Sequence, residues 1–392
     1  MPDEPLIISD DDRYSRMRLI AWWDQEKLKG AKVLVVGIGA LGNEVAKNLV
    51  LMGVGDVYGI DMDCVEDSNL TRSVLFRESD NGRPKADAAA RSLYQLNPDS
   101  RFHPIEGNVI TDIGLGLVRD VDVVIGCLDN REARLWVNRM CWKVGTPWVD
   151  GGIQEINGVA KVFVPPDGAC YECAMTENDY RLMNLRYSCP LLKREDILEG
   201  KVPTAPTISS IIAGLQTQEA LKLIHNMPVE DGTAMVFNGI ANNFYKTNYQ
   251  HRDDCLSHDT YPQPTLSGLS HESKLSEVFE FARKAMSEAD LTLQLDRDLV
   301  ESLDCSSCGE SEVVLRPTHL VSANSLPCPK CKADRKPKLT HQIAADSTLI
   351  HKTAAEIGIP RYDLVRFFSA DQEIVVELNG DRDAAHQQFY SG

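Results

Sequence analysis

The chain has 392 residues, 43% of them hydrophobic, enough for two or three domains with ordinary cores. Its net charge is −17 and no basic block is long enough to follow a nucleic-acid backbone, so we expect no nucleic-acid partner. The sequence has no apolar run of membrane-spanning length and no signal-peptide pattern, so we expect a cytoplasmic protein without a membrane partner. In that compartment, eleven cysteines favour metal binding or thiol chemistry over disulfides.

The first strong motif follows a predicted helical arm, residues 13–28, that carries three closely spaced arginines. Residues 32–36 form an apolar run that predicts a strand, and Gly37, Gly39 and Gly42 follow in G-x-G-x-x-G spacing before a helical pattern. Such a turn typically holds a phosphate, because glycine allows close backbone approach and the first helical N–H groups point at an anion. Alone, the same glycines could serve only to let a helix pack on a sheet.

Two later strands are predicted to end in acidic residues. The strand at 56–60 leads into Asp61, about twenty residues beyond the glycine turn, where a ribose hydroxyl is usually held. The buried strand at 121–128 leads into Asp129, which faces the same crevice in a doubly wound sheet. A carboxylate beside a triphosphate is a natural Mg²⁺ ligand, although Asp129 could instead cap the helix predicted at 131–144.

An amide and two cations, Asn69, Arg72 and Lys85, are expected near the same phosphate site. A dehydrogenase that binds a dinucleotide has no need of such a cluster. An enzyme that neutralises charge developing on a triphosphate does need one. The sequence therefore favours ATP over a nicotinamide dinucleotide.

Eight metal-ligand residues fall into two sets of paired knuckles. The first set suits one tetrahedral zinc, unless its histidine is merely exposed. The second set has a nineteen-residue spacer, which is typical of a zinc ribbon. Two separate zinc ions are the simplest account. The first set is Cys170, Cys173, Cys255 and His258, and the second is Cys305, Cys308, Cys328 and Cys331.

Together, these motifs resemble the ubiquitin-activating (ThiF-like) superfamily, with the likeness running from about Arg13 to His258. The matching segments are the Arg-Tyr-x-Arg arm, the glycine turn, Asp-x-Asp, Asn-x-x-Arg, Lys85 after Gly-x-Pro, Cys-x-Asp-Asn and Cys-x-x-Cys. That family binds Mg-ATP and adenylates the C-terminal glycine of a ubiquitin-like protein. The resemblance implies ATP and Mg²⁺ as cofactors beside zinc, a ubiquitin-like protein as partner, and a homodimer.

The resemblance also assigns roles to individual residues. It implies that Asn69, Arg72 and Lys85 contact phosphates, that Asp129 binds Mg²⁺, and that Arg16 crosses a dimer interface into the partner's site. The nucleotide is otherwise expected to be bound by Gly37, Gly39, Ala40, Leu41, Gly42, Asp61 and Asp63.

Three further cysteines lie in or beside predicted core elements: Cys64, Cys127 and Cys141. We interpret them as small buried hydrophobic residues. Cys189 differs, because it lies in a polar stretch that matches the family's crossover loop, where the catalytic cysteine is found. Nearby cations would lower the pKa of its thiol. Pro190 follows it where eukaryotic members usually place threonine.

We therefore predict a doubly wound, Rossmann-like and mostly parallel α/β sheet with an appended small α+β domain that contains the zinc ribbon. The expected division is an arm over 1–30, an adenylation domain with crossover loop and zinc knuckles over 31–260, and a C-terminal domain over 270–392.

The expected activity is adenylation of a ubiquitin-like protein, thioester formation on Cys189 and transfer to a carrier (conjugating) enzyme. Alternatives are a sulfur-carrier adenylyltransferase that stops at the adenylate, an NAD-dependent dehydrogenase, and a pseudo-enzyme subunit that only scaffolds a partner. The resemblance favours conjugation, because sulfur-transfer members of the family either lack a separate C-terminal domain or carry a rhodanese, and no rhodanese-type cysteine loop follows residue 265.

Overall fold

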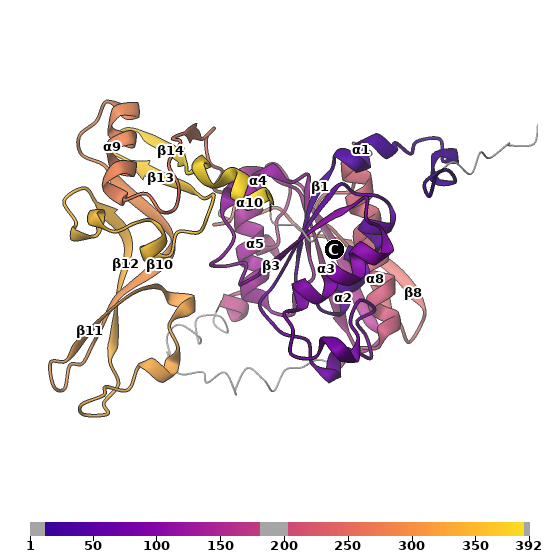
Figure 1. The fold of residues 1–392 in the computed structure, drawn as a ribbon, viewed down its shortest axis with the longest axis horizontal. Coiled ribbons are helices and arrows are strands. Elements are labelled where there is room, and N and C mark those ends of the chain that lie inside the picture. Colours follow the sequence, from indigo (N-terminus) through magenta and orange to yellow (C-terminus); the bar gives the residue numbers. More distant parts are fainter. Residues whose placement is uncertain (1–11, 181–202, 388–392) are drawn as a thin grey trace, which may run out of the picture.

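Two β-sheets organise the chain, and the computed structural model describes residues 12–180 and 203–387 (Figure 1). The larger sheet has eight strands in the order β3-β2-β1-β4-β5-β6-β7-β8. The first five run parallel, and the last three continue the sheet antiparallel. Their bounds are β1 Lys32–Val36, β2 Asp56–Asp61, β3 Arg101–Glu106, β4 Val123–Gly126, β5 Trp148–Gln154, β6 Asn157–Phe163, β7 Thr233–Asn238 and β8 Asn243–Asn248. The prediction of a large, parallel-rich α/β sheet is confirmed.

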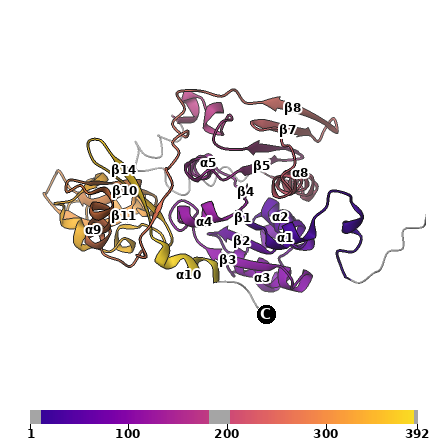
Figure 2. The same ribbon diagram turned by 90° about the horizontal axis from the view of Figure 1, so that it is seen from above.

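Helices cover both faces of this sheet because its central strands are apolar on both sides. On β1, Val33 and Val35 pack against one set of helices, and Leu34 and Val36 pack against the other. The first set is α2 (Ala40–Leu51), α3 (Lys85–Leu96) and α8 (Pro206–Ile224). The second set is α4 (Leu115–Asp120) and α5 (Arg131–Val144). Figure 2 shows α4 and α5 on one side of the strands and α2 and α8 on the other.

The arm is not the continuous helix predicted over 13–28. It contains a 3₁₀ turn at Met17–Leu19 and a separate short helix, α1 (Gln25–Gly30). The two are distinct because Ile20 is extended and the side chain of Asp24 accepts N–H groups of the new helix as its N-cap.

The C-terminal residues form a second sheet in the order β11-β10-β13-β14-β9, with β12 pairing with β10. The long strand β10 contacts β11, β12 and β13 in turn, and helix α9 (Leu275–Met286) packs against this sheet. The short strand β9 already pairs with β14, so the second sheet begins a few residues before position 270. The strands are β9 Thr265–Leu266, β10 Thr292–Asp304, β11 Ser311–Pro317, β12 Lys336–Ala344, β13 Leu364–Phe368 and β14 Glu373–Glu377.

From the sequence we predict one helix over residues 348–357, and the structure contradicts this prediction. Two 3₁₀ turns, Thr348–His351 and Ala355–Ile357, occupy this segment instead. Thr353 between them pairs with Lys274 in an isolated β-bridge, and this extended pairing interrupts the helix.

The second sheet packs against α4 and α5, on the side of the first sheet that these helices cover (Figure 1). Tyr362 is fully buried against this side of the larger sheet, in one apolar cluster with Tyr58 and Leu364. The last helix, α10 (Arg382–Gln387), returns to α4, where His386 lies between the hydroxyl of Tyr58 and the carboxylate of Asp120. None of the helices in the two described ranges is both long and apolar enough to cross a membrane.

Candidate active site

The glycine turn joins β1 to α2 at the carboxyl edge, our name for the edge at which β1 to β5 end. Gly37 has φ +91° and its N–H donates to the carbonyl of Ile60 at 2.8 Å. A Cβ on Gly37 would lie 2.6 Å from a Cys127 carbonyl oxygen, and one on Gly42 would lie 1.9 Å from the Gly37 oxygen. A Cβ on Gly39 would meet no atom within 4 Å. The fold itself thus requires Gly37 and Gly42, whereas the space beside Gly39 is open to a ligand.

Asn43 holds this turn in shape and was not predicted as a site residue. Its fully buried amide donates to the carbonyls of Ile38 (2.8 Å) and Gly39 (3.0 Å), and its oxygen accepts the Leu75 N–H at 2.8 Å. A polar residue on the buried face of a predicted amphipathic helix was the available signal, because buried amides need partners.

Asp61 ends β2 beside the turn, as predicted. One carboxylate oxygen accepts the N–H of Ile38 at 2.7 Å, and the other accepts the N–H of Asp63 at 2.8 Å. Burial raises the pKa of Asp61, and the charge of Lys85, 4.0 Å away, opposes this rise. The carboxylate keeps lone pairs that can accept a ribose hydroxyl.

Lys85 is brought to Asp61 by pairing between two loops. Its backbone N–H donates to the Asp63 carbonyl at 2.9 Å, and its ammonium lies 2.9 Å from the Asp63 carboxylate. The structure therefore gathers three predicted residues, Asp61, Asp63 and Lys85, at one end of β2. Lys85 is largely buried and has its charge at the carboxyl edge.

Asn69 and Arg72 lie in the loop that follows β2. Asn69 closes a 3₁₀ turn by accepting the Glu66 N–H at 3.0 Å, and Arg72 donates to the carbonyl of Ser68 at 2.7 Å. Both side chains are half-buried, and the hydrogen bonds described for them lie within this loop.

Asp129 follows β4 and is exposed. The alternative that it caps α5 is wrong, since the cap is Asn130, whose oxygen accepts the Ala133 N–H at 2.8 Å. Asn130 also donates to Asp129 at 3.2 Å. The Asp129 carboxylate is thus free of the capping role and faces solvent at the carboxyl edge.

A buried ion network lies beneath Asp129 and was missed by sequence reasoning. Arg134 donates to the carbonyls of Leu128 (2.5 Å) and Gly151 (2.8 Å) and to the carboxylate of Asp150 (3.0 Å). Lys161 donates to the other oxygen of Asp150 at 2.7 Å. By holding the Leu128 carbonyl, Arg134 fixes the backbone that presents Asp129. An aspartate inside an apolar strand was the only hint in the sequence.

Arg16 lies far from the glycine turn of its own chain. Tyr14 anchors the arm, because its buried ring packs at Gly53 and its hydroxyl accepts the Asn97 amide at 2.6 Å. Gly53 precedes β2 and Asn97 precedes β3, so the arm lies at the opposite edge of the sheet from the glycine turn. A six-residue strand separates the edges by about 17–20 Å. Arg16 itself is exposed.

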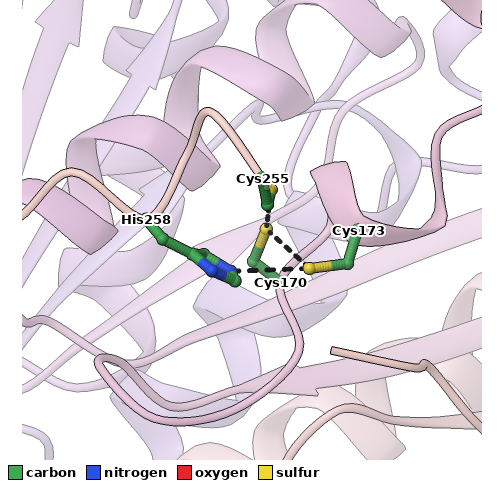
Figure 3. Close-up of side chains that lie close together, drawn as sticks. All are labelled: Cys170, Cys173, Cys255 and His258. Carbon is green, nitrogen blue, oxygen red and sulfur yellow. Dashed lines mark hydrogen bonds between the residues drawn. The ribbon is translucent and has the colours of Figure 1, made fainter. Parts of the chain in front are cut away.

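The first predicted metal set comes together in space (Figure 3). The Cys170 sulfur lies 3.7 Å from that of Cys173 and 3.5 Å from that of Cys255, and His258 Nε2 lies 3.4 Å from the Cys173 sulfur. Sulfurs that share a tetrahedral zinc lie about 3.8 Å apart, given Zn–S bonds of about 2.3 Å. The four residues therefore fit a structural zinc ion.

His258 is not simply a surface residue. Its ring stacks on Trp142 of α5, with centroids 5.3 Å apart, and on His251. Burial and the neighbouring His251 lower the pKa of His258, which favours the neutral imidazole that binds metals.

Glu172 joins the two knuckles of this set to α5. It is fully buried, and it accepts the Ser257 hydroxyl, the Tyr180 hydroxyl at 2.8 Å and the Arg139 guanidinium at 2.7 Å. Burial alone would raise the pKa of Glu172, but Arg139 and Ser257 outweigh burial and lower it. The knuckles are thus fixed by an ionised buried carboxylate.

The second set also comes together, at the end of β10 and β11. The sulfurs of Cys305 and Cys331 are 3.5 Å apart, and those of Cys308 and Cys328 are 3.6 Å apart. The residues after the two knuckles, Gly309 (φ +74°) and Lys332 (φ +64°), close matching turns onto the first cysteine of each pair. The two sets are separate, so each fits its own zinc.

The remaining cysteines divide into three cases. Cys141 is buried as predicted and Cys127 is half-buried, and burial raises the pKa of both thiols. The prediction that Cys64 is buried is wrong: it is exposed, because it lies in the loop after β2 and pairs by its backbone with Pro84. Cys189, with its neighbouring cations, falls outside the described residues.

This fold and these side chains define a class, namely doubly wound α/β proteins with a nucleotide-type glycine turn and cysteine knuckles after the parallel strands. Residues 12–257, more than half of the chain, match the ThiF family. The chain belongs to the ThiF family, and the resemblance drawn from its motifs is confirmed.

Known relatives and solved structures agree with this assignment. The chain is 32% identical to the SAMP-activating enzyme E1 of Haloferax volcanii, a match covering 62% of this chain and 87% of the relative. It is also 32% identical to the sulfur carrier protein ThiS adenylyltransferase of Escherichia coli, over 58% and 86% of the two chains. The crystal structure of E. coli MccB with ATP superposes with a TM-score of 0.54 and 26% identity, over 66% and 77% of the two chains.

Proposed function

We propose that this protein binds ATP at the carboxyl edge and adenylates the C-terminal carboxylate of a ubiquitin-like or sulfur-carrier protein. The observation that carries the proposal is one arrangement of groups: open space beside Gly39, a lysine held 2.9 Å from Asp63, and an exposed Asp129 free of capping. A relative named for SAMP activation, another named for ThiS adenylylation and a solved relative with ATP support the same activity.

In the proposed reaction, a carboxylate oxygen of the partner bonds to the α-phosphorus, and the bond from that phosphorus to the bridging oxygen breaks. Pyrophosphate leaves and an acyl-adenylate forms. Negative charge develops on the phosphoryl oxygens, and Lys85 and Arg72 would neutralise it. The N–H groups of the glycine turn would bind phosphate. Asp129 would hold Mg²⁺, which supplies further charge neutralisation when bound.

Calorimetry with ATP and with NAD⁺ tests the nucleotide assignment. We expect the intact chain to bind ATP in the presence of Mg²⁺ and not to bind NAD⁺. Asp129→Asn should make ATP binding depend less on Mg²⁺. The variant should still fold, because this side chain is exposed. If the chain bound NAD⁺ and did not bind ATP, the result would instead support the dehydrogenase alternative.

We further propose an active homodimer in which Arg16 completes the partner subunit's site. Two observations support it: Tyr14 anchors the arm at the edge opposite its own glycine turn, and Leu19, Ile20 and Trp22 on the arm are 41–46% exposed. A second copy would cover these apolar side chains. Mixing an Arg16→Ala chain with a Lys85→Ala chain should restore one competent site in each heterodimer. Absence of any restored pyrophosphate exchange would contradict this arrangement.

The step after adenylation separates two functions. For conjugation, a thiolate would displace AMP from the acyl-adenylate, form a thioester and pass the modifier to a carrier enzyme, and Cys189 is our candidate nucleophile. Cys189→Ala should then keep pyrophosphate exchange but lose a reductant-sensitive adduct, whereas Asp129→Ala should lose both. If Cys189→Ala retains the adduct, the exposed Cys64 is the next candidate. If no cysteine matters, the enzyme stops at the adenylate, as a sulfur-carrier adenylyltransferase does.

We also propose that both cysteine sets bind zinc, two ions per chain. The support is the fit of the sulfur distances to a tetrahedral ion. The proposed division into an arm (1–30), an adenylation domain (31–260) and a C-terminal zinc-ribbon domain (270–392) follows the two sheets, although the domains share an apolar cluster.

A further inference from the structure

We propose that Arg297, on the C-terminal sheet, is a positioning residue for the nucleotide, because it holds the loop that borders the base. The inference rests on the proposed ATP site. It concerns the β3–α4 loop, residues 107–114, which begins at the carboxyl edge. Arg297 lies outside the 12–257 segment that matches the ThiF family.

The path of the nucleotide along the carboxyl edge places its base at this loop. The phosphates lie at the glycine turn that ends β1, and the ribose lies at Asp61, which ends the neighbouring strand β2. Continuing in the same direction brings the base to the end of β3. There the loop contacts the ribose residue directly, because the Gly107 N–H donates to the Asp61 carbonyl at 3.2 Å and Glu106 pairs with Asp61 in the sheet.

Arg297 ties this loop to the second sheet. Its guanidinium donates to the carbonyl of Ile110 and, at 3.0 Å, to that of Ile113. The same guanidinium pairs with Asp363 at 3.0 Å and lies over the ring of Trp136 of α5, 5.0 Å from its centroid. With 7% of its surface exposed, Arg297 is a buried cation whose donors serve two carbonyls of one loop and one carboxylate.

Asp363 secures the end of the loop that joins α4. Its second oxygen accepts the N–H of Leu115, the first residue of α4, at 2.7 Å. Beside this bond, the N–H of Gly116 donates to the carbonyl of Tyr362. Burial raises the pKa of Asp363, while Arg297 counteracts this rise. The ion pair between Arg297 and Asp363 therefore holds the middle of the β3–α4 loop and the end of the loop that joins α4.

The bonds within the loop do less to fix its position than the bonds to Arg297 and Asp363. Its internal bonds, such as those from the Asn108 N–H and the Asp112 N–H, close a local turn but do not fix that turn against β2. We infer that Arg297 and Asp363 make the C-terminal sheet part of the nucleotide-binding machinery, so that a change in this sheet alters affinity for ATP.

The test compares two conservative variants of the full chain. Arg297→Lys keeps the charge but loses the planar fork that serves both carbonyls. Arg366→Lys is the matched control, since Arg366 also joins the two parts of the chain, through Asp259 at 3.0 Å, but makes no bond to the loop. Calorimetry measures the Kd for ATP, and hydrogen exchange measures opening of residues 107–115.

We expect Arg297→Lys to weaken ATP binding about tenfold and to speed exchange in the loop, with Arg366→Lys close to the unaltered chain. ATP should slow exchange in the loop of the unaltered chain. Unchanged ATP affinity in a folded Arg297→Lys protein, even with faster exchange, would show a merely structural role and overturn the inference. Equal weakening by both variants would also overturn it. If the unaltered chain binds no ATP, the proposed function fails and this inference fails with it.

Discussion

The glycine turn offers a test in which neighbouring glycines should respond in opposite ways. In Gly42→Ala the new Cβ would lie 1.9 Å from the Gly37 oxygen and 2.9 Å from the Gly37 carbon, whereas an ordinary contact needs at least 3.4 Å. Backbone atoms must move, and overpacking of this kind costs about 3 kcal/mol. For 392 residues, with an unfolding entropy of about 2.1 cal/mol/K per residue, that cost lowers Tm by roughly 4 °C. The loss should be visible without any nucleotide.

Gly39→Ala should behave differently, because the site has open space and φ is −78°, a value that alanine readily adopts. Because Gly39 is the N-cap of α2 and alanine caps less well than glycine, its free energy of unfolding should fall by no more than about 1 kcal/mol. The methyl group would occupy the space where we place phosphate, so affinity for ATP should fall at least about tenfold, or about 1.4 kcal/mol.

Thermal unfolding and calorimetry with ATP distinguish the two effects. Gly30→Ala is the control, since its added Cβ also meets no atom within 4 Å and Gly30 lies at the amino end of β1, away from the turn. We expect Gly30→Ala to change neither quantity. The reasoning is refuted if Gly39→Ala, or the bulkier Gly39→Val, binds ATP normally, or if Gly42→Ala is as stable as the unaltered chain.

Three further predictions follow from the buried charges and the cysteines. Arg134→Met should lower the free energy of unfolding by about 3–5 kcal/mol, measured by denaturant titration, because it removes one of the two cations paired with the buried Asp150; a neutral result would contradict the network. Metal analysis should find two zinc ions per chain and one in Cys308→Ser; two in the variant would be evidence against the second site. Burial alone would raise the pKa of Asp120, but hydrogen bonds from His386 and Tyr362 outweigh it and lower the pKa below its ordinary value of about 3.9. Ionised Asp120 therefore stabilises the fold above about pH 4, and this stability should be lost as pH falls further. Asp120→Asn should flatten the acid limb of a stability–pH curve.

The elements that could be predicted are those whose signals are local. The strand, turn and helix around Gly37 and Gly42 are specified by adjacent residues, and the positions of Asp61 and Asp129 follow from the rule that ligands meet the carboxyl ends of parallel strands. Both metal sets were also predictable, since a pair spaced as Cys-x-x-Cys needs only one turn to bring its sulfurs together.

What could not be predicted depends on contacts between distant segments. Arg297 and Ile110 are 187 positions apart, and nothing near either one indicates the other. Nothing near Arg134 in the sequence indicates that β5 places the carboxylate of Asp150 beside it. The alternation of Leu291, Leu293 and Leu295 predicts a short strand there, whereas β10 runs to Asp304 because three different strands pair with it. Strand length was thus decided by pairing rather than by periodicity.

Helix α5 gives a physical link between the first cysteine set and the carboxyl edge. Its cap follows Asp129 directly, its second turn carries Arg134 beneath that residue, and its third turn carries Arg139, bound to Glu172 inside the first knuckle. The last turn carries Trp142, stacked on His258, and Lys143, which pairs with Asp296 of the C-terminal sheet.

A helix is stiff over this length, so groups attached along α5 keep a fixed spacing. The first cysteine set lies beside the end of α5 remote from Asp129, where it holds that end against the polypeptide that follows the parallel strands. The second set lies at the ends of β10 and β11, and none of its described sulfur contacts involves α5. The first set therefore contributes to the position of Asp129 through α5, whereas the second holds together the ends of the strands of the C-terminal sheet.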